Sequence, residues 1–255
     1  YYAEYGAQPL GRANDPLPEL NWSGARNLGK VVIVSTPNAG YADTFLELLN
    51  GLQMLPLAPV YPAGVIGTFP SYYQMLPDPG TRSILWKSSG VPVDCFDIEL
   101  WKKYRWGMLS EQSRELWDEL MPELSPAARE RAVYAHLEQC LSLGRRFKEV
   151  MRRPAGTPPY DVRFYLFAGD GMLTNHHLVV DPNDGGVHVA GQEAGDGKVT
   201  ATSARFDLRD GGRWTFHMRS PIAWRGVCYL PGAHMGILDS DVFMDNLRYV
   251  LMVEP

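Results

Sequence analysis

Two glycine-rich runs near the end of the chain hold residues suited to acid–base chemistry. The first is Gly195-Asp196-Gly197, and the second is Gly232-Ala233-His234-Met235-Gly236. A carboxylate that orients an imidazole, and an imidazole that moves a proton, are two members of the Ser-His-Asp triads that catalyse acyl transfer. Asp196 precedes His234 by 38 positions (234 − 196), and each follows a strand-like region and lies between small residues. The spacing predicts a catalytic Asp–His pair, although Asp-Gly is also a common turn.

The third member of such a triad is a serine on a sharp G-x-S-x-G turn between a strand and a helix. No such motif occurs in the 255 residues. A second carboxylate, Asp170, competes with Asp196, because it lies in another Gly-Asp-Gly run directly after an apolar segment. Position favours Asp170, since α/β sheets place their sites at the carboxyl ends of strands. From the residues alone, both carboxylates stay open.

The other histidines give weaker signals for catalysis or for metal binding. His176 and His177 are adjacent, and neighbours in a strand point to opposite faces, so they are a poor start for a metal site. His136 falls in a helical segment, whereas His188 and His217 fall in alternating segments. Surface or hydrogen-bonded structural roles suit these five better. The sequence therefore predicts neither a metal nor a cofactor.

The segments that must position these residues alternate between strands and helices. Residues 30–36, a continuous β-branched run, predict a central parallel strand that is covered on both faces. Further strands are expected at 162–168, 178–180, 187–189, 214–217 and 226–230, and helices at 43–52, 110–121, from 125 to about 153, and 240–251. A turn at 181–186 predicts a hairpin. This pattern indicates an α/β fold with a mostly parallel sheet flanked by helices.

Residues 68–158 interrupt the alternation and are predicted to form an inserted cap over the sheet, within one domain that covers 1–255. The segment 68–106 is aromatic and irregular, which fits either a loop-rich wall of the core or the lining of an apolar substrate groove. Of the two helices that follow, the longer ends in a basic cluster at 145–153. The cluster is either a solvated helix end that complements the helix dipole or a contact with an anionic lipid surface.

Composition excludes several classes of protein. Hydrophobic residues make up 45% and charged residues 21%, as in a globular domain with a sizeable core. The net charge of −5, without any Lys/Arg run, argues against a nucleic-acid partner. No apolar stretch approaches the roughly 18 residues of a membrane span. Cys95, Cys140 and Cys228 share no close spacing, so neither a disulfide framework nor a zinc knuckle is indicated.

Several runs match one known family in order along nearly the whole chain. They are Ser-Thr-Pro-Asn-Ala-Gly at 35–40, Phe-Pro-Ser-Tyr-Tyr-Gln-Met-Leu-Pro at 69–77, the aromatic segment 96–107, Gly-Asp-Gly-Lys-Val-Thr at 195–200, and His234 in its loop. On these runs the chain resembles the lecithin:cholesterol acyltransferase-like family of α/β-hydrolases, particularly its bacterial members. The family's Gly-Asp-Gly-x-Val motif, with a serine a few positions on, matches Asp196 and Ser203 rather than Asp170. Its catalytic histidine matches His234.

The resemblance implies serine-dependent acyl transfer or ester hydrolysis, of the lipase, phospholipase or O-acyltransferase type, on a lipid or other acyl ester. In this family a helix resembling Arg-Tyr-Tyr-x-x-Tyr-Gly follows the elbow serine, and residues 1–6, Tyr-Tyr-Ala-Glu-Tyr-Gly, look like its tail. We therefore expect the nucleophile and its oxyanion donor just before residue 1, on a missing N-terminal segment that would be a partner of this chain. The alternative is a non-catalytic fragment or pseudo-enzyme that acts as an interaction or scaffold module.

Overall fold

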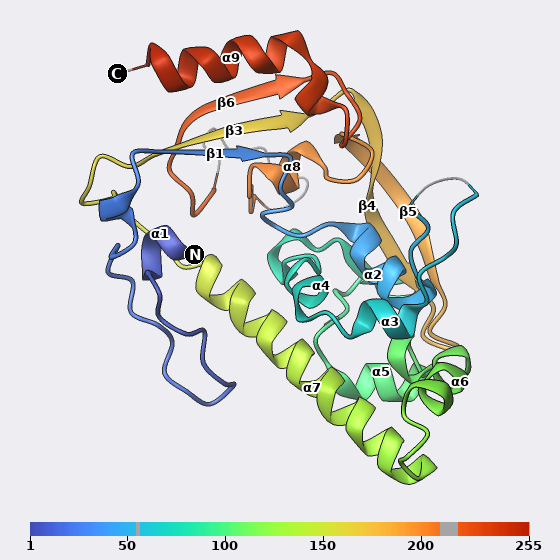
Figure 1. Ribbon diagram of the computed structural model, residues 1–255. Helices are drawn as coiled ribbons and strands as arrows, with labels where there is room; N and C mark the ends of the chain where they lie inside the picture. Colours follow the sequence, from blue (N-terminus) through green and yellow to red (C-terminus); the bar gives the residue numbers. More distant parts are fainter. Residues whose placement is uncertain (55–56, 210–218, 255) are drawn as a thin grey trace.

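The computed structural model describes residues 1–54, 57–209 and 219–254 (Figure 1). Within these residues the strands form two three-stranded sheets, with the orders β1-β3-β6 and β2-β4-β5, and helices flank both. The chain is thus mixed α/β with mostly parallel pairing, as the alternation of strand and helix patterns predicts. The strand predicted at 214–217 lies outside the described residues.

The first sheet is parallel throughout. Its strands are β1 (Lys30–Val34), β3 (Arg163–Gly169) and β6 (Trp224–Leu230). Their positions confirm three of the predicted strands. Since parallel strands end at the same edge of a sheet, the segments that follow β1, β3 and β6 meet there.

β1 differs from its prediction in one respect. The run 30–36 was expected at the centre of a sheet, but within the described residues β1 pairs with β3 alone and forms an edge. All five of its residues are only half-buried. The side chains of this apolar run are therefore less buried than its composition predicts. One edge of the β1 backbone pairs with no other strand of the described chain.

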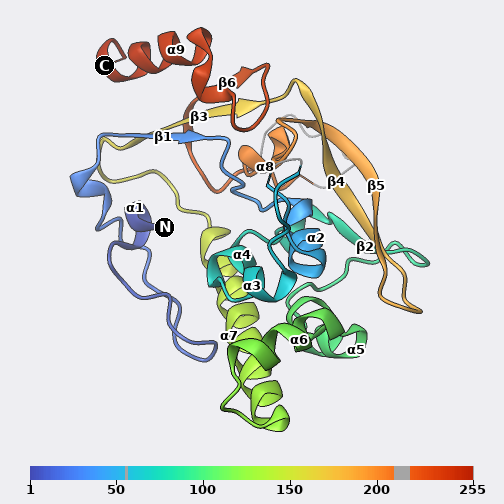
Figure 2. The same cartoon turned by 45° about the vertical axis from the view of Figure 1, so that its right-hand side comes forward.

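The second sheet contains the predicted hairpin. Its strands are β2 (Ile84–Trp86), β4 (Met172–Val180) and β5 (Val187–Gly195). β4 and β5 are antiparallel and are joined at the predicted turn, where the amide of Asp181 donates to the carbonyl of Gly186 at 2.8 Å. Both strands are longer than the short apolar runs that indicated them. Figure 2 shows the hairpin beside β2, which pairs in parallel with β4 although it comes from within 68–158.

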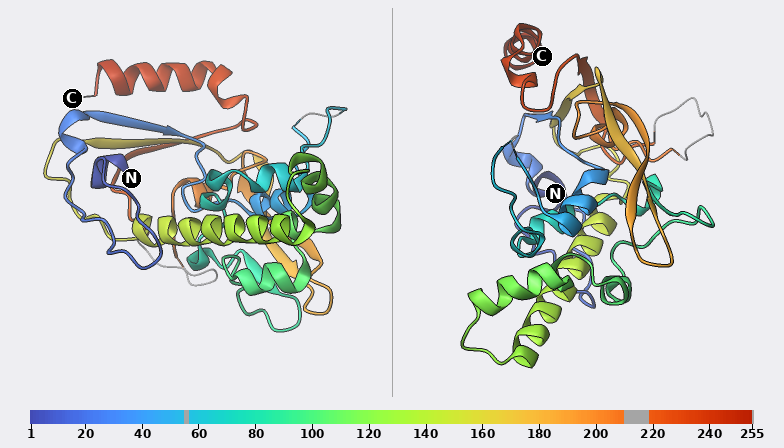
Figure 3. Two further views of the ribbon diagram at one scale, coloured as in Figure 1. Left: turned by 60° about the horizontal axis from the view of Figure 1, so that its bottom comes forward. Right: turned by 90° about the vertical axis from the view of Figure 1, so that its right-hand side faces the viewer.

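Helices surround the sheets, and three of them begin at serine caps that the sequence indicates. They are α1 (Tyr2–Tyr5), α2 (Ala42–Asn50), α3 (Ala63–Gly67), α4 (Pro70–Gln74), α5 (Ile98–Tyr104), α6 (Glu111–Leu120), α7 (Pro126–Met151), α8 (Ala201–Ala204) and α9 (Asp241–Met252). The hydroxyls of Ser110, Ser125 and Ser240 accept hydrogen bonds from amides in the first turns of α6, α7 and α9. α9 lies on one side of the first sheet and α7 on the other (Figures 1 and 3).

The largest core cluster lies among α2, α5 and α7, and aromatic residues of 68–106 supply much of it. Phe45 contacts Trp106 edge to face, with ring centroids 5.2 Å apart, and Trp101 is fully buried. Each such side chain contributes about 1.5–3 kcal/mol by leaving water. Of the two alternatives for this aromatic segment, the structure shows the wall of a core.

The basic cluster at the end of α7 is engaged within the protein. Arg146 and Lys148 are buried, and the guanidinium of Arg146 donates to the carbonyls of Leu10 and Pro16. The expectation of a solvated helix end is therefore wrong for these two residues, because the loop that follows α1 packs over this end of the helix. Arg145 stays exposed, and contact with an anionic lipid surface stays a prediction.

Candidate functional site

The two predicted residues, Asp196 and His234, are hydrogen-bonded to each other. Asp196 directly follows β5, and His234 follows β6 by a short loop. The Oδ2 atom of Asp196 lies 2.8 Å from Nδ1 of His234. The backbone amide of His234 also donates to the carbonyl oxygen of Asp196, at 2.8 Å. The pair thus joins the end of the second sheet to the carboxyl edge of the first.

Asp196 is held on a tight turn that its own side chain stabilises. Its Oδ1 atom accepts hydrogen bonds from the amides of Lys198, at 2.9 Å, and Val199, at 2.7 Å. Short polar side chains favour such turns because they bind the backbone two or three residues on. Gly197 adopts a φ of 90°, where glycine is favoured, and its amide donates to Oγ1 of Thr174 at 2.8 Å. The carboxylate therefore has a fixed orientation.

Asp196 is ionised near neutral pH although it is only 2% exposed. Burial, the largest single influence, raises its pKa, but the hydrogen bonds from His234, Val199 and Lys198 together outweigh burial. The net effect lowers the pKa of Asp196 below its ordinary value. A buried carboxylate that remains charged can hold an imidazole and stabilise it when it becomes protonated.

His234 presents its second ring nitrogen on the open side of the pair. Because Nδ1 faces a carboxylate, Nδ1 carries the proton in the neutral ring and Nε2 holds the lone pair. The side chain is 34% exposed, and Nε2 makes no hydrogen bond to any residue that the structure describes. The arrangement suits a general base that takes a proton at Nε2.

Asp170 lies close in the fold but is not the partner of His234. It follows β3 and is exposed. The β4–β5 hairpin explains why Asp196 is buried beside His234. Met172 at the start of β4 pairs with Gly195 at the end of β5, so the chain returns to the end of β3 just before Asp196. A Cβ atom on Gly169 would lie 2.5 Å from Cβ of Asp196, so only glycine permits this approach. Sequence reasoning missed this role of Gly169, whose signal was the Gly-Asp-Gly run itself.

Two runs that carry the family resemblance also meet in space. Ser203, next to the Asp196 turn, donates its hydroxyl proton to the carbonyl of Gly40, and the amide of Ala39 donates to the carbonyl of Ser203. Ser35, at the carboxyl end of β1, has a φ of 44°. Its buried hydroxyl has no hydrogen-bond partner among the described residues. Strained backbone and unpaired polar groups are concentrated at functional sites.

Four of the remaining histidines are described, and they lie on other elements. His176 and His177 belong to β4, where Nδ1 of His176 lies 3.4 Å from Oε1 of Glu193. His136 on α7 contacts the carbonyl of Thr68 through Nε2, at 3.1 Å, and His188 is exposed on β5. His217 lies outside the described residues. In the described ranges no group of three or more His, Cys, Asp or Glu could hold a metal ion.

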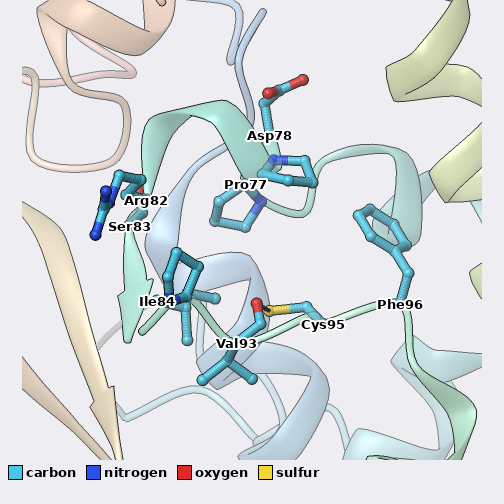
Figure 4. A pocket seen from close by; sticks show the side chains of 10 residues that line it. Pro77, Asp78, Arg82, Ser83, Ile84, Val93, Cys95 and Phe96 are labelled. Atoms are coloured by element: carbon cyan, nitrogen blue, oxygen red, sulfur yellow. Dashed lines mark hydrogen bonds between the residues drawn. The ribbon is translucent and has the colours of Figure 1, made fainter. Parts of the chain in front are cut away.

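Of three cavities in the described chain, one of about 10 Å³ is lined by Gly40, Thr200 and Ser203, next to the Asp196 turn, and the other two lie elsewhere. Figure 4 shows a small one of about 20 Å³, lined among others by Asp78, Ser83 and Phe96, which has room for about one water molecule. A wide cleft of about 1160 Å³ lies among α5, α6 and α7 and includes Trp117 and Tyr134. Neither contains Asp196 or His234, so neither identifies a substrate for the pair.

No protein-family model matches the sequence, and no curated protein matches it significantly. Among the helices that the structure describes, none is both long and apolar enough to cross a bilayer. The resemblance to the acyltransferase-like family rests on the residues themselves and stays a prediction.

Proposed function

We propose that Asp196 and His234 are two members of a Ser-His-Asp triad in an enzyme with an α/β-hydrolase fold. The enzyme would transfer the acyl group of a lipid or other acyl ester to water or to an alcohol. One observation carries the proposal: a buried carboxylate binds Nδ1 of His234 at 2.8 Å while Nε2 stays unpaired within the described chain. Both residues follow strands at one edge of the fold, where α/β proteins place catalytic groups.

Each side chain has a defined part in the reaction. Nε2 of His234 takes the proton of a serine hydroxyl as the serine oxygen attacks the ester carbonyl carbon. Asp196 holds the imidazole in the required tautomer and stabilises the imidazolium. The imidazolium then protonates the departing alcohol, which leaves an acyl-serine. Water or an alcohol, deprotonated by the same Nε2, then attacks the carbonyl carbon of the acyl-serine. The serine oxygen leaves and takes its proton back from the imidazolium, and the acid or the new ester is released.

The serine would come from a further segment that adds a strand beside β1. Support comes from β1 itself, whose Val-Val-Ile-Val run forms an edge without the proline or bulge that often protects an edge. Its charged residue, Lys30, is bound to carbonyls at the end of α9. A parallel strand added there would end at the same edge as β1, β3 and β6. Its following turn would then lie near His234, as a G-x-S-x-G elbow requires.

The test uses the protein with its elbow-bearing segment. A fluorophosphonate probe should label one serine, and hydrolysis of p-nitrophenyl butyrate should fall at least about 1,000-fold in His234→Ala. Asp170→Asn serves as the matched control for Asp196→Asn and should retain near-normal turnover. Normal turnover of His234→Ala would remove His234 from the reaction. A folded protein that neither reacts with the probe nor hydrolyses esters would favour the non-catalytic interaction module.

A further inference from the structure

A buried carboxylate on α2 contacts the turn that carries Asp196. Glu47 is only 6% exposed although its helix is amphipathic and has a solvent face. Its Oε2 atom accepts a hydrogen bond from the hydroxyl of Tyr41 at 2.9 Å, and its Oε1 atom binds Nζ of Lys198 at 2.8 Å. Each carboxylate oxygen therefore has its own partner.

Such a group is costly to bury, and it persists only where its partners are well placed. Tyr41 serves as a neutral donor, because burial and then the negative charge of Glu47 raise the pKa of its hydroxyl. Lys198 is the cationic partner, and its side chain is 43% exposed, so solvent screens part of the attraction. An ion pair on the surface would form without burial of the carboxylate and without a hydrogen bond from Tyr41. The burial of Glu47 therefore indicates that this contact has a structural role.

Lys198 connects this carboxylate directly to the candidate site. Its side chain is held by Glu47, and its backbone amide donates to Oδ1 of Asp196 at 2.9 Å. A second polar contact, from Nδ2 of Asn175 on β4 to Oδ1 of Asp43 on α2 at 2.7 Å, also joins α2 to the second sheet. The helix α2 thus contacts the second sheet at the turn that follows β5 and, separately, at β4.

The contact matters because Asp196 and His234 belong to different sheets. Asp196 ends the hairpin of the second sheet, whereas His234 follows β6 of the first. The helix α2 follows β1 of the first sheet through the loop 35–41. Fixing the Asp196 turn to α2 therefore fixes it relative to the sheet that carries His234.

We infer that the Glu47–Lys198 ion pair, with Tyr41 as the second partner of Glu47, positions the Asp196 carboxylate for its hydrogen bond to His234. Glu47 and the Lys198 side chain are positioning groups and act through the backbone of the turn. The catalytic purpose of this positioning rests on the proposed function. The test measures the conformation of the turn directly and needs no substrate.

The test follows the turn by nuclear magnetic resonance in residues 1–255. Lys198→Met keeps the aliphatic stem and removes the ammonium group. Hydrogen exchange of the Val199 amide, which donates to Asp196, should accelerate at least about tenfold. The pKa of Asp196 should rise toward its ordinary value, since its hydrogen bonds weaken. Glu47→Gln should have the same effects, the double variant should add little to either, and Lys198→Arg should restore both readouts.

The matched control removes a cation from another buried carboxylate. Arg152 pairs with the fully buried side chain of Asp78 at 2.8 Å, so Arg152→Met should destabilise the fold comparably while leaving both readouts unchanged. Wild-type exchange at Val199 in both Lys198→Met and Glu47→Gln would overturn the inference, as would an equal change in Arg152→Met. If the readouts respond as expected but the protein with the proposed elbow-bearing segment hydrolyses no ester, the inference stands and the proposed function fails.

Discussion

Replacing Asp196 by asparagine should reverse the tautomer of His234. The carboxylate accepts three hydrogen bonds, from Nδ1 of His234 and from the amides of Lys198 and Val199. An asparagine has one oxygen and one NH₂ group for the same positions. Because the two amides can only donate, they retain the oxygen, and the NH₂ group faces His234. Nδ1 must then accept, which moves the ring proton to Nε2.

The magnitude follows from the same contacts. A hydrogen bond to a charged group contributes about 1.5–3 kcal/mol, roughly twice a neutral one, so three weakened bonds should lower stability. Relief of the buried charge offsets part of this loss, and we expect Asp196→Asn to cost about 1–3 kcal/mol of unfolding free energy. In the proposed Ser-His-Asp triad, a histidine with the proton on Nε2 has no lone pair for the serine, and turnover should fall by about four orders of magnitude.

The assay needs only residues 1–255 labelled with ¹⁵N. Imidazole nitrogen shifts distinguish the protonated nitrogen of His234, and urea unfolding gives the free energy. Asp170→Asn removes an exposed carboxylate from the other Gly-Asp-Gly run and should leave both measurements unchanged. If His234 in Asp196→Asn still carries its proton on Nδ1, the assigned hydrogen-bond geometry is wrong.

Three further predictions concern pH, packing and the sheet edge. The folded state lowers the pKa of Asp196, so the ionised carboxylate stabilises the fold fully above its ordinary pKa of 3.8, and this stabilisation disappears as the pH falls through the lowered pKa. Urea unfolding should therefore show that the free energy of unfolding falls on acidification, and that it falls less in Asp196→Asn. Gly169→Ala places a Cβ against Asp196 and should cost at least about 1–3 kcal/mol of unfolding free energy and disrupt the His234 contact, as read from imidazole shifts. The apolar edge of β1 should make residues 1–255 self-associate as the protein concentration rises, which analytical ultracentrifugation would detect; a chain that stays monomeric at every concentration would contradict this.

Local patterns were sufficient for most elements. The β-branched runs of β1 and β3 and the serine caps of α6, α7 and α9 involve neighbours in sequence, so their signals are readable without a fold. The identities of Asp196 and His234 as a pair likewise followed from motif and order. The three-residue β2 was not indicated, because it is too short to show a period.

Only the tertiary structure showed that Asp196 contacts His234 and what holds the carboxylate in place. Asp170 and Asp196 share the same local motif, and the register of the β4–β5 hairpin brings the second back to the end of β3. Contacts between Glu47 and Lys198, 151 positions apart, leave no trace in local sequence. A pairing between distant segments depends on strand register and on close approach at Gly169, and neither is a property of any single stretch of chain.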